Sequence, residues 1–461
     1  MGRARARGIP AQLVEDEEYQ LRYEKVAGID IAKAKGDVCT RLPPARQGGR
    51  RRSRLEEVAA TVPQVLALAG RLMADGAELV SMESTSDYWR LWYFVLEAAG
   101  LKVQLVSSSQ ARQLAGRPKT DRLDAQWIAR LAEMGLLRPS FVPPPQIREL
   151  RDWTRARLHL VRDRTAEWQR LEKLLEGALV KVSSVVSSLA GNMTARAIIE
   201  ALIEGERDPR RLADLAKGSL RGKRAQLAAA LEGSAFGPRH ARLARLHLDR
   251  IDALDRDVAA LEGEVAACLE GIEGAWGVDA AGVARPDPGE GAAVLAAAAR
   301  IAEIPGVSLE LAMAIIAETG LDMSRFKTAA HLVSWAGLAP SARQSGARSR
   351  KPGKGRGNSY LKGYCTQAAV GTARTDTFLG ERLRRLSRRI GGARALVAVG
   401  RSILVIIWHL LSDPAARYAD LGSGWHARKT DRDKKITGHL RQLRALGLEV
   451  TVTETQAGAA A

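Results

Sequence analysis

A repeating seam of apolar residues near the middle of the chain limits most strongly what this sequence can fold into. Its members recur at alternating spacings of three and four residues: Ile251, Leu254, Val258, Leu261, Val265 and Cys268. This is the repeat of a coiled coil, in which a long helix packs against a partner helix. The partner is either an antiparallel helix of the same chain or a helix of another subunit, and its apolar residues are Leu150, Trp153, Trp168, Leu171 and Leu175. We therefore predict a helical coiled-coil segment over residues 146–270, with His247 packed or solvated on the seam rather than binding a metal.

Before this segment, β-prone stretches alternate with helical ones. Strands are expected at residues 24–31, 37–42, 78–82 and 102–106, the first two as a hairpin. Helices are expected at residues 55–74, at 88–99, and from the acids at 121 and 124 to about 137. Such alternation predicts an α/β domain with a mixed sheet over residues 23–142, which a run of three prolines from Pro143 ends.

After the coiled coil, residues 293–427 are expected to form a third, mostly α-helical domain. Residues 304–320 have the form of a helix-hairpin-helix element, whose turn presents backbone N–H groups to a DNA phosphate. Ser308 stands where a second glycine is usual, so an ordinary αα-hairpin explains the segment equally well. Further helices are expected at residues 331–338, 360–372 and 393–411, the last as a core helix. A flexible arm (residues 1–22), a Gly/Pro-rich linker (271–292) and a charged tail (428–461) complete the chain.

The charge of the chain favours a polyanionic partner. Lys and Arg number 71 against 52 Asp and Glu, which gives a net charge of +19. The most apolar run, residues 396–411, contains Arg401 and is short for a bilayer span, and no apolar stretch follows the basic residues 1–7. Cys39, Cys268 and Cys365 have neither zinc-ligand nor disulfide spacing. We therefore expect a cytoplasmic protein that binds nucleic acid and no membrane.

Four acidic residues are placed where a metal site can form. Asp121 and Asp124 are neighbours on the first turn of a helix, where capping of that helix is the better interpretation of the pair alone. Asp30 and Glu83 end two predicted strands, and strand ends and helix starts meet at the carboxyl edge of an α/β sheet. Carboxylates that converge there repel by about 4 kcal/mol per close pair at an effective dielectric near 20. Divalent cations turn this repulsion into binding, and Mg²⁺ prefers carboxylate, water and phosphate oxygens.

A basic loop in the third domain contains no acidic residue between positions 341 and 363. It carries three serines, Ser341, Ser345 and Ser349, which in such a loop are ordinarily solvated or form turns. Guanidinium and ammonium groups hold phosphates well. The candidate nucleic-acid-binding residues are Arg343, Arg348, Arg350, Lys351, Lys354, Arg356, Asn358 and Lys362.

The segments that contain the four acids, residues 28–33, 82–85 and 119–125, resemble the DEDD tetrad of a RuvC-like, ribonuclease-H-type domain. Four further segments resemble the C-terminal domain of the same family: residues 304–306, 335–340, 344–346 and 356–361. This family is the DEDD transposases of bacterial insertion sequences, which are related to Piv-type DNA invertases. Some of its members are bridge-RNA-guided recombinases.

The resemblance implies a transposase or DNA recombinase in which Ser345 attacks DNA and forms a phosphoserine link. The catalytic and metal-binding acids that it implies are Asp30, Glu83, Asp121 and Asp124, which bind Mg²⁺ or, in its place, Mn²⁺. The implied partners are the ends and target of a DNA element, a structured noncoding RNA, and copies of the chain in a homodimer or homotetramer. The implied place of action is the nucleoid of a bacterial cytoplasm. Residues 192–233 and 271–290 look longer than this family leads us to expect.

Two other functions remain open from the sequence. In the first, the chain is a purely metal-dependent nuclease, similar to a junction resolvase, in which water attacks the phosphodiester and Ser345 is incidental. In the second, it is a non-enzymatic nucleic-acid-binding scaffold whose acids only cap helices. Formation of a covalent protein–DNA adduct separates the recombinase from the nuclease, and the effect of Asp121→Asn on DNA processing separates the enzymes from the scaffold.

Overall fold

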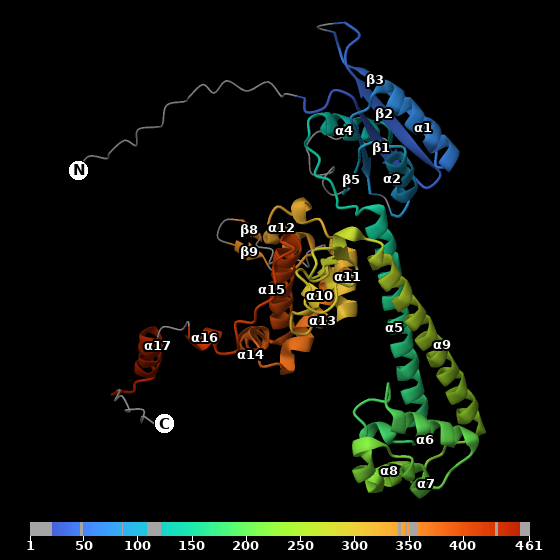
Figure 1. Ribbon diagram of the computed structural model, residues 1–461, viewed down its shortest axis with the longest axis vertical. Coiled ribbons are helices and arrows are strands. Elements are labelled where there is room, and N and C mark those ends of the chain that lie inside the picture. Colours follow the sequence, from blue (N-terminus) through green and yellow to red (C-terminus); the bar gives the residue numbers. More distant parts are fainter. Residues whose placement is uncertain are drawn as a thin grey trace. The chain divides into compact units, whose positions relative to one another are not determined.

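The computed structural model describes residues 21–46, 49–84, 86–107, 121–339, 343–345, 348–350, 357–428 and 432–451. Most of the predicted arm, residues 1–20, and the end of the tail from residue 452 lie outside this description. The chain divides into two compact units, Met1–Val142 and Pro143–Ala461, which are taken one at a time below (Figure 1).

The first unit is built on a five-stranded mixed sheet, so the mixed sheet predicted from the sequence is confirmed. The strands are β1 (Val26–Ile31), β2 (Lys35–Leu42), β3 (Arg52–Ala59), β4 (Leu79–Glu83) and β5 (Val103–Val106). Their order is β3-β2-β1-β4-β5. β1 pairs with β2 and β2 with β3 in the antiparallel sense, whereas β1 with β4 and β4 with β5 are parallel.

Helices cover both faces of this sheet (Figure 1). Because side chains alternate along a strand, β1 contributes Ala27 and Ile29 to one face and Val26 to the other. The first face packs against α1 (Val62–Asp75) and α2 (Trp89–Ala98). The second packs against α4 (Asp121–Glu133).

The helix predicted at residues 55–74 is wrong in its first part, because residues up to Ala59 belong to β3. Thr61 has extended dihedral angles, and a proline stands in the first turn of α1, so the helix begins only at Val62. Ion pairs hold the strand to the helix, with Arg54 Nη2 2.5 Å from Asp75 Oδ2 and Arg71 Nη2 2.7 Å from Glu56 Oε2. Pairing with β2 and with α1 therefore overrides the helical composition of this stretch.

Helix α4 approaches the sheet most closely at Gly28. A Cβ atom at this glycine would lie 2.4 Å from both the carbonyl oxygen of Ala125 and the backbone nitrogen of Ala129. Further along the helix, Glu133 accepts a hydrogen bond of 2.7 Å from Arg41, at the end of the sheet where β1 begins. Helix α4 therefore runs antiparallel to β1, and its first turn lies toward the end of β1.

In the second unit, two helices of 33 residues form a long hairpin, α5 (Pro145–Gly177) and α9 (Pro238–Glu270) (Figure 1). Arg157 pairs with Glu262 and Arg164 with Asp255, a pattern that fixes the helices as antiparallel. Ile251, Val258 and Val265 of the predicted seam are buried, as are Leu150, Leu171 and Leu175 of the partner. Of the two partners left open by the sequence, the structure shows the antiparallel helix of the same chain. His247 accompanies the seam with its Nδ1 2.7 Å from Glu167 Oε2.

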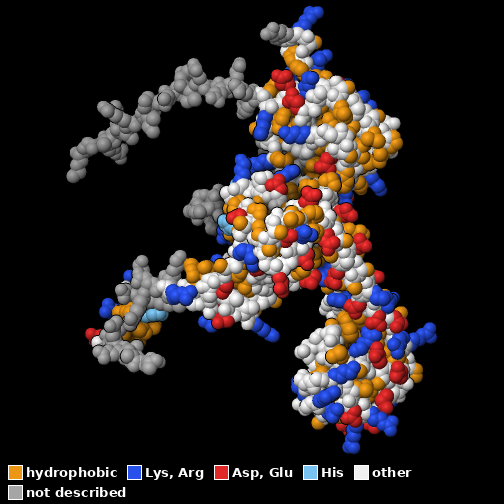
Figure 2. Space-filling view, in the orientation of Figure 1, with side chains coloured by type: hydrophobic (Ala, Val, Ile, Leu, Met, Phe, Trp, Pro, Cys, Tyr) orange, Lys and Arg blue, Asp and Glu red, His pale blue; other side chains and the backbone are white. Residues whose placement is uncertain are grey.

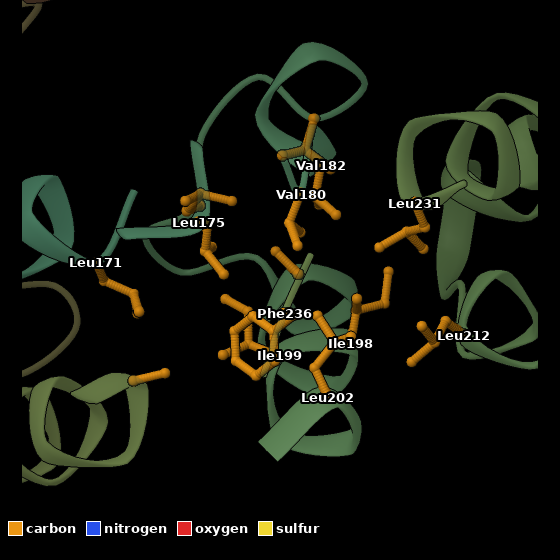
Figure 3. Close-up of a cluster of buried hydrophobic side chains, with 14 of the residues drawn as sticks. Leu171, Leu175, Val180, Val182, Ile198, Ile199, Leu202, Leu212, Leu231 and Phe236 are labelled. Atoms are coloured by element: carbon orange, nitrogen blue, oxygen red, sulfur yellow. The ribbon is translucent and has the colours of Figure 1, made fainter. Parts of the chain in front are cut away.

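The segment between these helices has a hydrophobic core of its own (Figure 3). It consists of η1 (Val182–Ser184), α6 (Met193–Glu204), α7 (Pro209–Asp214), η2 (Gly218–Lys223) and α8 (Arg224–Leu231). Ile198, Ile199 and Leu202 of α6 pack with residues of α5 and α8 in this core. Positive and negative side chains alternate over its surface (Figure 2).

The rest of the second unit is mostly helical. Short elements precede its helices: η3 (Glu273–Ala275) and the hairpin of β6 (Gly277–Val278) and β7 (Ala284–Arg285), within the predicted linker. The helices and remaining turns are α10 (Ala297–Ala302), α11 (Leu309–Thr319), η4 (Met323–Arg325), α12 (Ala329–Trp335), α13 (Ser359–Gly371), η5 (Thr372–Arg374), α14 (Phe378–Ile390), α15 (Gly392–Ser412), α16 (Trp425–Arg428) and α17 (Arg432–Ala445).

Helix α15 is the central helix of this part. It packs against α10, α12, α13 and α14, and buries Val399, Ile403 and Ile407. By length and composition alone it is also the one helix among the described residues that could cross a bilayer. A buried helix of a globular core passes the same test, and the four neighbouring helices give α15 that role.

We predict that Gly28→Ala destabilises the first unit by about 2 kcal/mol or more, because the added methyl group overlaps the backbone of α4. Thermal unfolding of the full chain, followed by hydrogen exchange in β1 and α4, measures this loss. Gly70→Ala is the matched control. This exposed position within α1 has nothing within 4 Å of the added atom, so we expect stabilisation of about 0.5–1 kcal/mol. Equal effects of the two substitutions would contradict the close approach at Gly28.

Candidate functional site

The acids that end two of the predicted strands lie next to each other at one edge of the sheet. β1 and β4 are parallel and pair Ile29 with Met82, so Asp30 and Glu83 follow at adjacent positions. Both belong to the face that α4 covers, because their neighbours Ile29 and Met82 face the opposite core. Glu83 is 5% exposed and Asp30 is half-buried. This is the carboxyl end of the parallel strands, where sites of α/β proteins are built.

The first turn of α4 brings a third acid toward this edge. Ala125 packs on Gly28, and the half-buried Asp124 directly precedes it. Asp121 is the first residue of the helix, but its side chain lies outside the description. The structure therefore brings three of the four predicted acids to one end of one face, and places the backbone of the fourth one turn earlier on the same helix.

A further carboxylate that the sequence analysis missed stands beside this group. Asp37 of β2 is the antiparallel partner of Asp30, so the two side chains share a face of the sheet. It is 8% exposed. On its other side Asp37 is opposite Glu57 of β3, which forms an ion pair of 2.5 Å with Lys35. An acid directly before the apolar pair Val38 and Cys39 of the predicted hairpin strand was the signal in the sequence that could have identified it.

The chemistry of these side chains fits a hard divalent cation. Carboxylate oxygens are the ligands that Mg²⁺ prefers, and this ion needs only one or two of them beside water and phosphate oxygens. No group of three or more Asp, Glu, His or Cys side chains among the described residues is arranged to hold a metal ion by itself. A cation at this edge would therefore take part of its coordination from outside these side chains.

The predicted nucleophile lies in a short two-stranded ribbon of the second unit. β8 (Arg343–Ser345) and β9 (Arg348–Arg350) are antiparallel and pair Ser345 with Arg348 and Arg343 with Arg350. In this register the backbone of Ser345 lies opposite that of an arginine. Ser349 instead pairs with Gln344.

The other predicted nucleic-acid-binding residues divide into two groups. Lys351, Lys354 and Arg356 lie outside the described residues, as does the rival serine Ser341. Asn358 and Lys362 lie in the described part, at the start of α13. Asn358 Oδ1 accepts hydrogen bonds from the backbone of Tyr360 and Leu361 at 3.0 and 3.1 Å, so this residue is the N-cap of α13.

Asn358 also belongs to a buried network that sequence analysis missed. Its Nδ2 donates a hydrogen bond of 2.6 Å to Glu318 Oε2, at the end of α11. Glu318 is fully buried and accepts two hydrogen bonds from Arg155 of α5, at 2.8 and 2.9 Å. Arg151, one turn earlier in α5, donates to the backbone oxygens of Ala317 and Glu318 at 2.9 and 2.8 Å. One carboxylate thus joins α5, α11 and the residue that follows the serine loop.

The opposite charges of Arg155 and Glu318 in this network stabilise each other. Burial lowers the pKa of Arg155, but the hydrogen bond and charge of Glu318 outweigh it, so that its pKa is raised overall. Its guanidinium also lies 4.1 Å from the centre of the Tyr360 ring, a cation–π contact. A buried carboxylate without these cations would be very costly. The pairing of α5 with α11 and α13 is therefore fixed by charge as well as by shape.

In the suspected helix-hairpin-helix element, the glycine of the turn between α10 and α11 packs against another helix of the chain. Gly306 has φ +85°, and a Cβ there would lie 2.3 Å from the carbonyl oxygen of Ala368 in α13. Ser308 caps α11 through a hydrogen bond from Leu311 N to its Oγ at 3.3 Å. At Gly306 the glycine requirement is therefore explained by packing of an αα-hairpin.

Comparison with known proteins assigns both ends of the chain to one kind of protein. Residues 27–180 match the DEDD transposase family model of IS110, described as "Transposase". Residues 298–383 match the model described as "Transposase IS116/IS110/IS902 family". Among curated proteins no relative matches.

Solved structures of RuvC from Thermus thermophilus are also similar to part of the chain. One shares 18% identity and covers 25% of this chain and 99% of its own, with a TM-score of 0.21. The other, RuvC in complex with a Holliday junction substrate, shares 17% identity and covers 26% of this chain and 100% of its own, with a TM-score of 0.21.

The two family matches define the class of protein first: a transposase of an insertion sequence, an enzyme that cleaves and rejoins DNA. The chain belongs to the IS110 family of DEDD transposases, which confirms the family predicted from the sequence.

We predict that Asn358→Asp weakens the attachment of α13, because it places a second carboxylate 2.6 Å from Glu318 while it keeps a good N-cap oxygen. Loss of one partner from a buried charged network costs about 3–5 kcal/mol. Hydrogen exchange of the Tyr360 and Leu361 amides in the full chain measures the effect locally.

Adding Glu318→Gln to Asn358→Asp restores an amide opposite a carboxylate without changing the total charge. We expect the double variant to recover at least about 1 kcal/mol of coupling energy relative to the sum of the single variants. Strict additivity would show that these two side chains do not interact.

Proposed function

We propose that this transposase cleaves DNA with Ser345 as the nucleophile and with Asp30, Glu83, Asp121 and Asp124 as the acids that bind divalent metal. The register of the β8–β9 ribbon is the observation that supports Ser345. In this register Ser345 pairs with Arg348, next to the pair of Arg343 and Arg350, whereas Ser349 pairs with Gln344. Guanidinium groups are suited to hold a phosphate in two-point contacts.

In the proposed reaction, Ser345 Oγ forms a bond to phosphorus of the scissile phosphodiester and releases its proton to solvent. The bond from phosphorus to one bridging oxygen of the DNA breaks, and this oxygen takes up a proton from solvent and leaves as a DNA hydroxyl group. The phosphoserine ester keeps the energy of the broken bond, so that a hydroxyl of another strand attacks phosphorus and releases Ser345. A serine hydroxyl is a weak nucleophile, and neighbouring cations help to activate it. Because the phosphoserine ester keeps the energy of the broken bond, strand cleavage and rejoining need no external energy source.

The acids at the sheet edge of the first unit are the metal-binding residues of the proposal. Asp30, Glu83 and Asp124 present carboxylate oxygens on one face of the sheet, and Asp121 begins the helix from which Asp124 projects. When bound there, Mg²⁺, or Mn²⁺ in its place, would neutralise charge on the phosphodiester. The part of the carboxylates would be to hold that cation at the sheet edge. Asp37 adds negative potential beside Asp30.

We further propose that recognition of the element ends and the target is delegated to a structured noncoding RNA, in a homodimer or homotetramer. The net charge of +19 suits a chain that holds RNA and DNA strands together. Base pairing then reads the sequence while the protein reads the backbones. The observation that motivates this proposal is the resemblance of the chain to bridge-RNA-guided members of its family.

The serine assignment is tested by trapping. Incubation of the full chain with the DNA ends of its element and Mg²⁺ is expected to give an adduct that survives denaturation, and Ser345→Ala is expected to abolish it. Ser349→Ala, the control at the ribbon serine that pairs with Gln344, should leave the adduct at about the wild-type level. Cleavage without any adduct would instead support a purely metal-dependent nuclease in which water attacks.

The metal assignment is tested by Mn²⁺ binding to the full chain, measured by electron paramagnetic resonance in the absence of DNA. We expect Asp30→Asn to weaken binding by at least about tenfold, because it removes a ligand charge at the centre of the acidic edge. Glu57→Gln, in the same sheet but paired with Lys35, should change the affinity little. Unchanged binding in both variants would place the metal elsewhere.

A further inference from the structure

A cluster of cations without acidic partners lies where α14, α15 and α16 meet. Among the described residues, no carboxylate forms an ion pair with Arg382 or Arg385 of α14 or with Arg401 of α15. The Nε of Arg382 is buried and has no hydrogen-bond partner. Burial and the charges of Arg385 and Arg401 lower the pKa of Arg382, so the three guanidinium groups repel one another. The cluster therefore has unused capacity for an anion.

The histidine beside this cluster experiences the same excess of positive charge. Arg385 Nη2 donates to His426 Nε2 at 3.4 Å. Burial and the charges of Arg385 and Arg382 lower the pKa of His426, and only Glu381 opposes them. Glu381 is itself paired with Arg384 at 3.4 Å. Among the described residues, Glu381 is thus the acid that acts on His426, and it is shared with Arg384.

The other acid in this region is engaged by the backbone. Asp420 Oδ1 accepts hydrogen bonds from Phe378 N at 3.1 Å and from Tyr418 Oη at 3.0 Å, and its Oδ2 accepts one from Gly422 N at 3.0 Å. These contacts hold the segment after α15 against the start of α14. This segment forms one wall of a groove, and Asp420 is not an ion-pair partner of the arginines.

This groove is mostly apolar and joins the arginine cluster. It has a volume of about 600 Å³, and its lining includes Arg401, Val405, Ile406, Tyr418 and Leu421 together with Phe378. Phe378 stacks on His426 with ring centres 5.0 Å apart and meets Trp425 edge-on at 5.2 Å. An aromatic, apolar groove beside clustered guanidinium groups combines the two features that bind single-stranded nucleic acid: a surface for a base and charge for its phosphate.

We propose that Arg382, Arg385 and Arg401 bind a backbone phosphate of a nucleic-acid strand, and that an unpaired base of this strand enters the groove beside Phe378. The ligand is single-stranded, because an unpaired base enters a groove without the cost of unpairing and unstacking that a duplex base would pay. RNA and DNA both carry the required phosphate. The site lies outside the serine ribbon. It binds a strand and takes no part in the chemical step, so it does not depend on Ser345 as the nucleophile.

The test measures binding of the full chain to one short unstructured oligonucleotide, made as RNA and as DNA, by fluorescence anisotropy in EDTA so that no cleavage occurs. Arg401→Gln, at an exposed position that folding should tolerate, is expected to lower affinity about tenfold, the loss of one charge-assisted phosphate contact. The slope of log K against log salt should fall by about 0.7 for the lost single-strand phosphate. The strand type that loses more affinity is the natural ligand.

Arg239→Gln is the matched control, because it removes the same charge from an exposed position at the start of α9, a helix that packs against α5 and α6. Arg382→Lys is a second test variant, which keeps the charge and the fold but loses the two-point contact. Binding by Arg401→Gln and Arg382→Lys that equals binding by Arg239→Gln would overturn the proposal.

A thiopyrimidine in the oligonucleotide provides a local readout that general electrostatics would not change. Irradiation should crosslink it to the peptides that contain Phe378 or Tyr418 in the wild-type chain and much less in Arg401→Gln. Crosslinks found only at other peptides would refute a base site. The groove would then be better explained as a binding site for an apolar protein partner.

Discussion

The candidate acidic site depends on how closely α4 approaches β1. At Gly28 the two backbones nearly touch, and any larger residue would separate them. This contact sets the height of α4 above the sheet, and the antiparallel course of the helix sets its direction. Together they place Asp124 toward the end of β1 where Asp30 and Glu83 lie. A glycine two residues before an acid thus has a structural reason, because it allows a carboxylate from another element to come near.

The second unit depends on a different constraint, the burial of a charge. Glu318 is fully buried, and Arg155 and Asn358 satisfy its carboxylate. Packing alone allows helices to slide, but a buried carboxylate allows only the arrangement that brings its donors within hydrogen-bond distance. The long hairpin therefore has a fixed relation to the start of α13, where the serine loop ends. A movement of α5 would therefore displace the start of α13 first.

The sequence predicted those features that depend on local pattern. The apolar seam gave the long helix α9, and strand alternation gave the mixed sheet with Asp30 and Glu83 at strand ends. It failed where tertiary pairing decides. β3 has helical composition but pairs with β2, and the partners of Glu318 stand 163 and 40 residues away. Asp37 could not be related to Asp30 until the hairpin register was known. Periodicity reports which face is buried, whereas the partner of a buried charge is set by the whole fold.

The net charge of the chain indicated a polyanionic partner but not where it binds. Pairing of the charges distinguishes the two possibilities. Arg157 and Arg164 in the long hairpin, and Arg196 of α6 beside it, each have a carboxylate partner on α9, so these cations hold helices together. Around α14, Arg382 and Arg401 have no such partner among the described residues, and their mutual repulsion must be offset by packing. No ion pair in the described part of the fold compensates this repulsion, so an anion that binds these arginines best explains them. The cations that remain unpaired after folding therefore identify the surface that a nucleic acid uses.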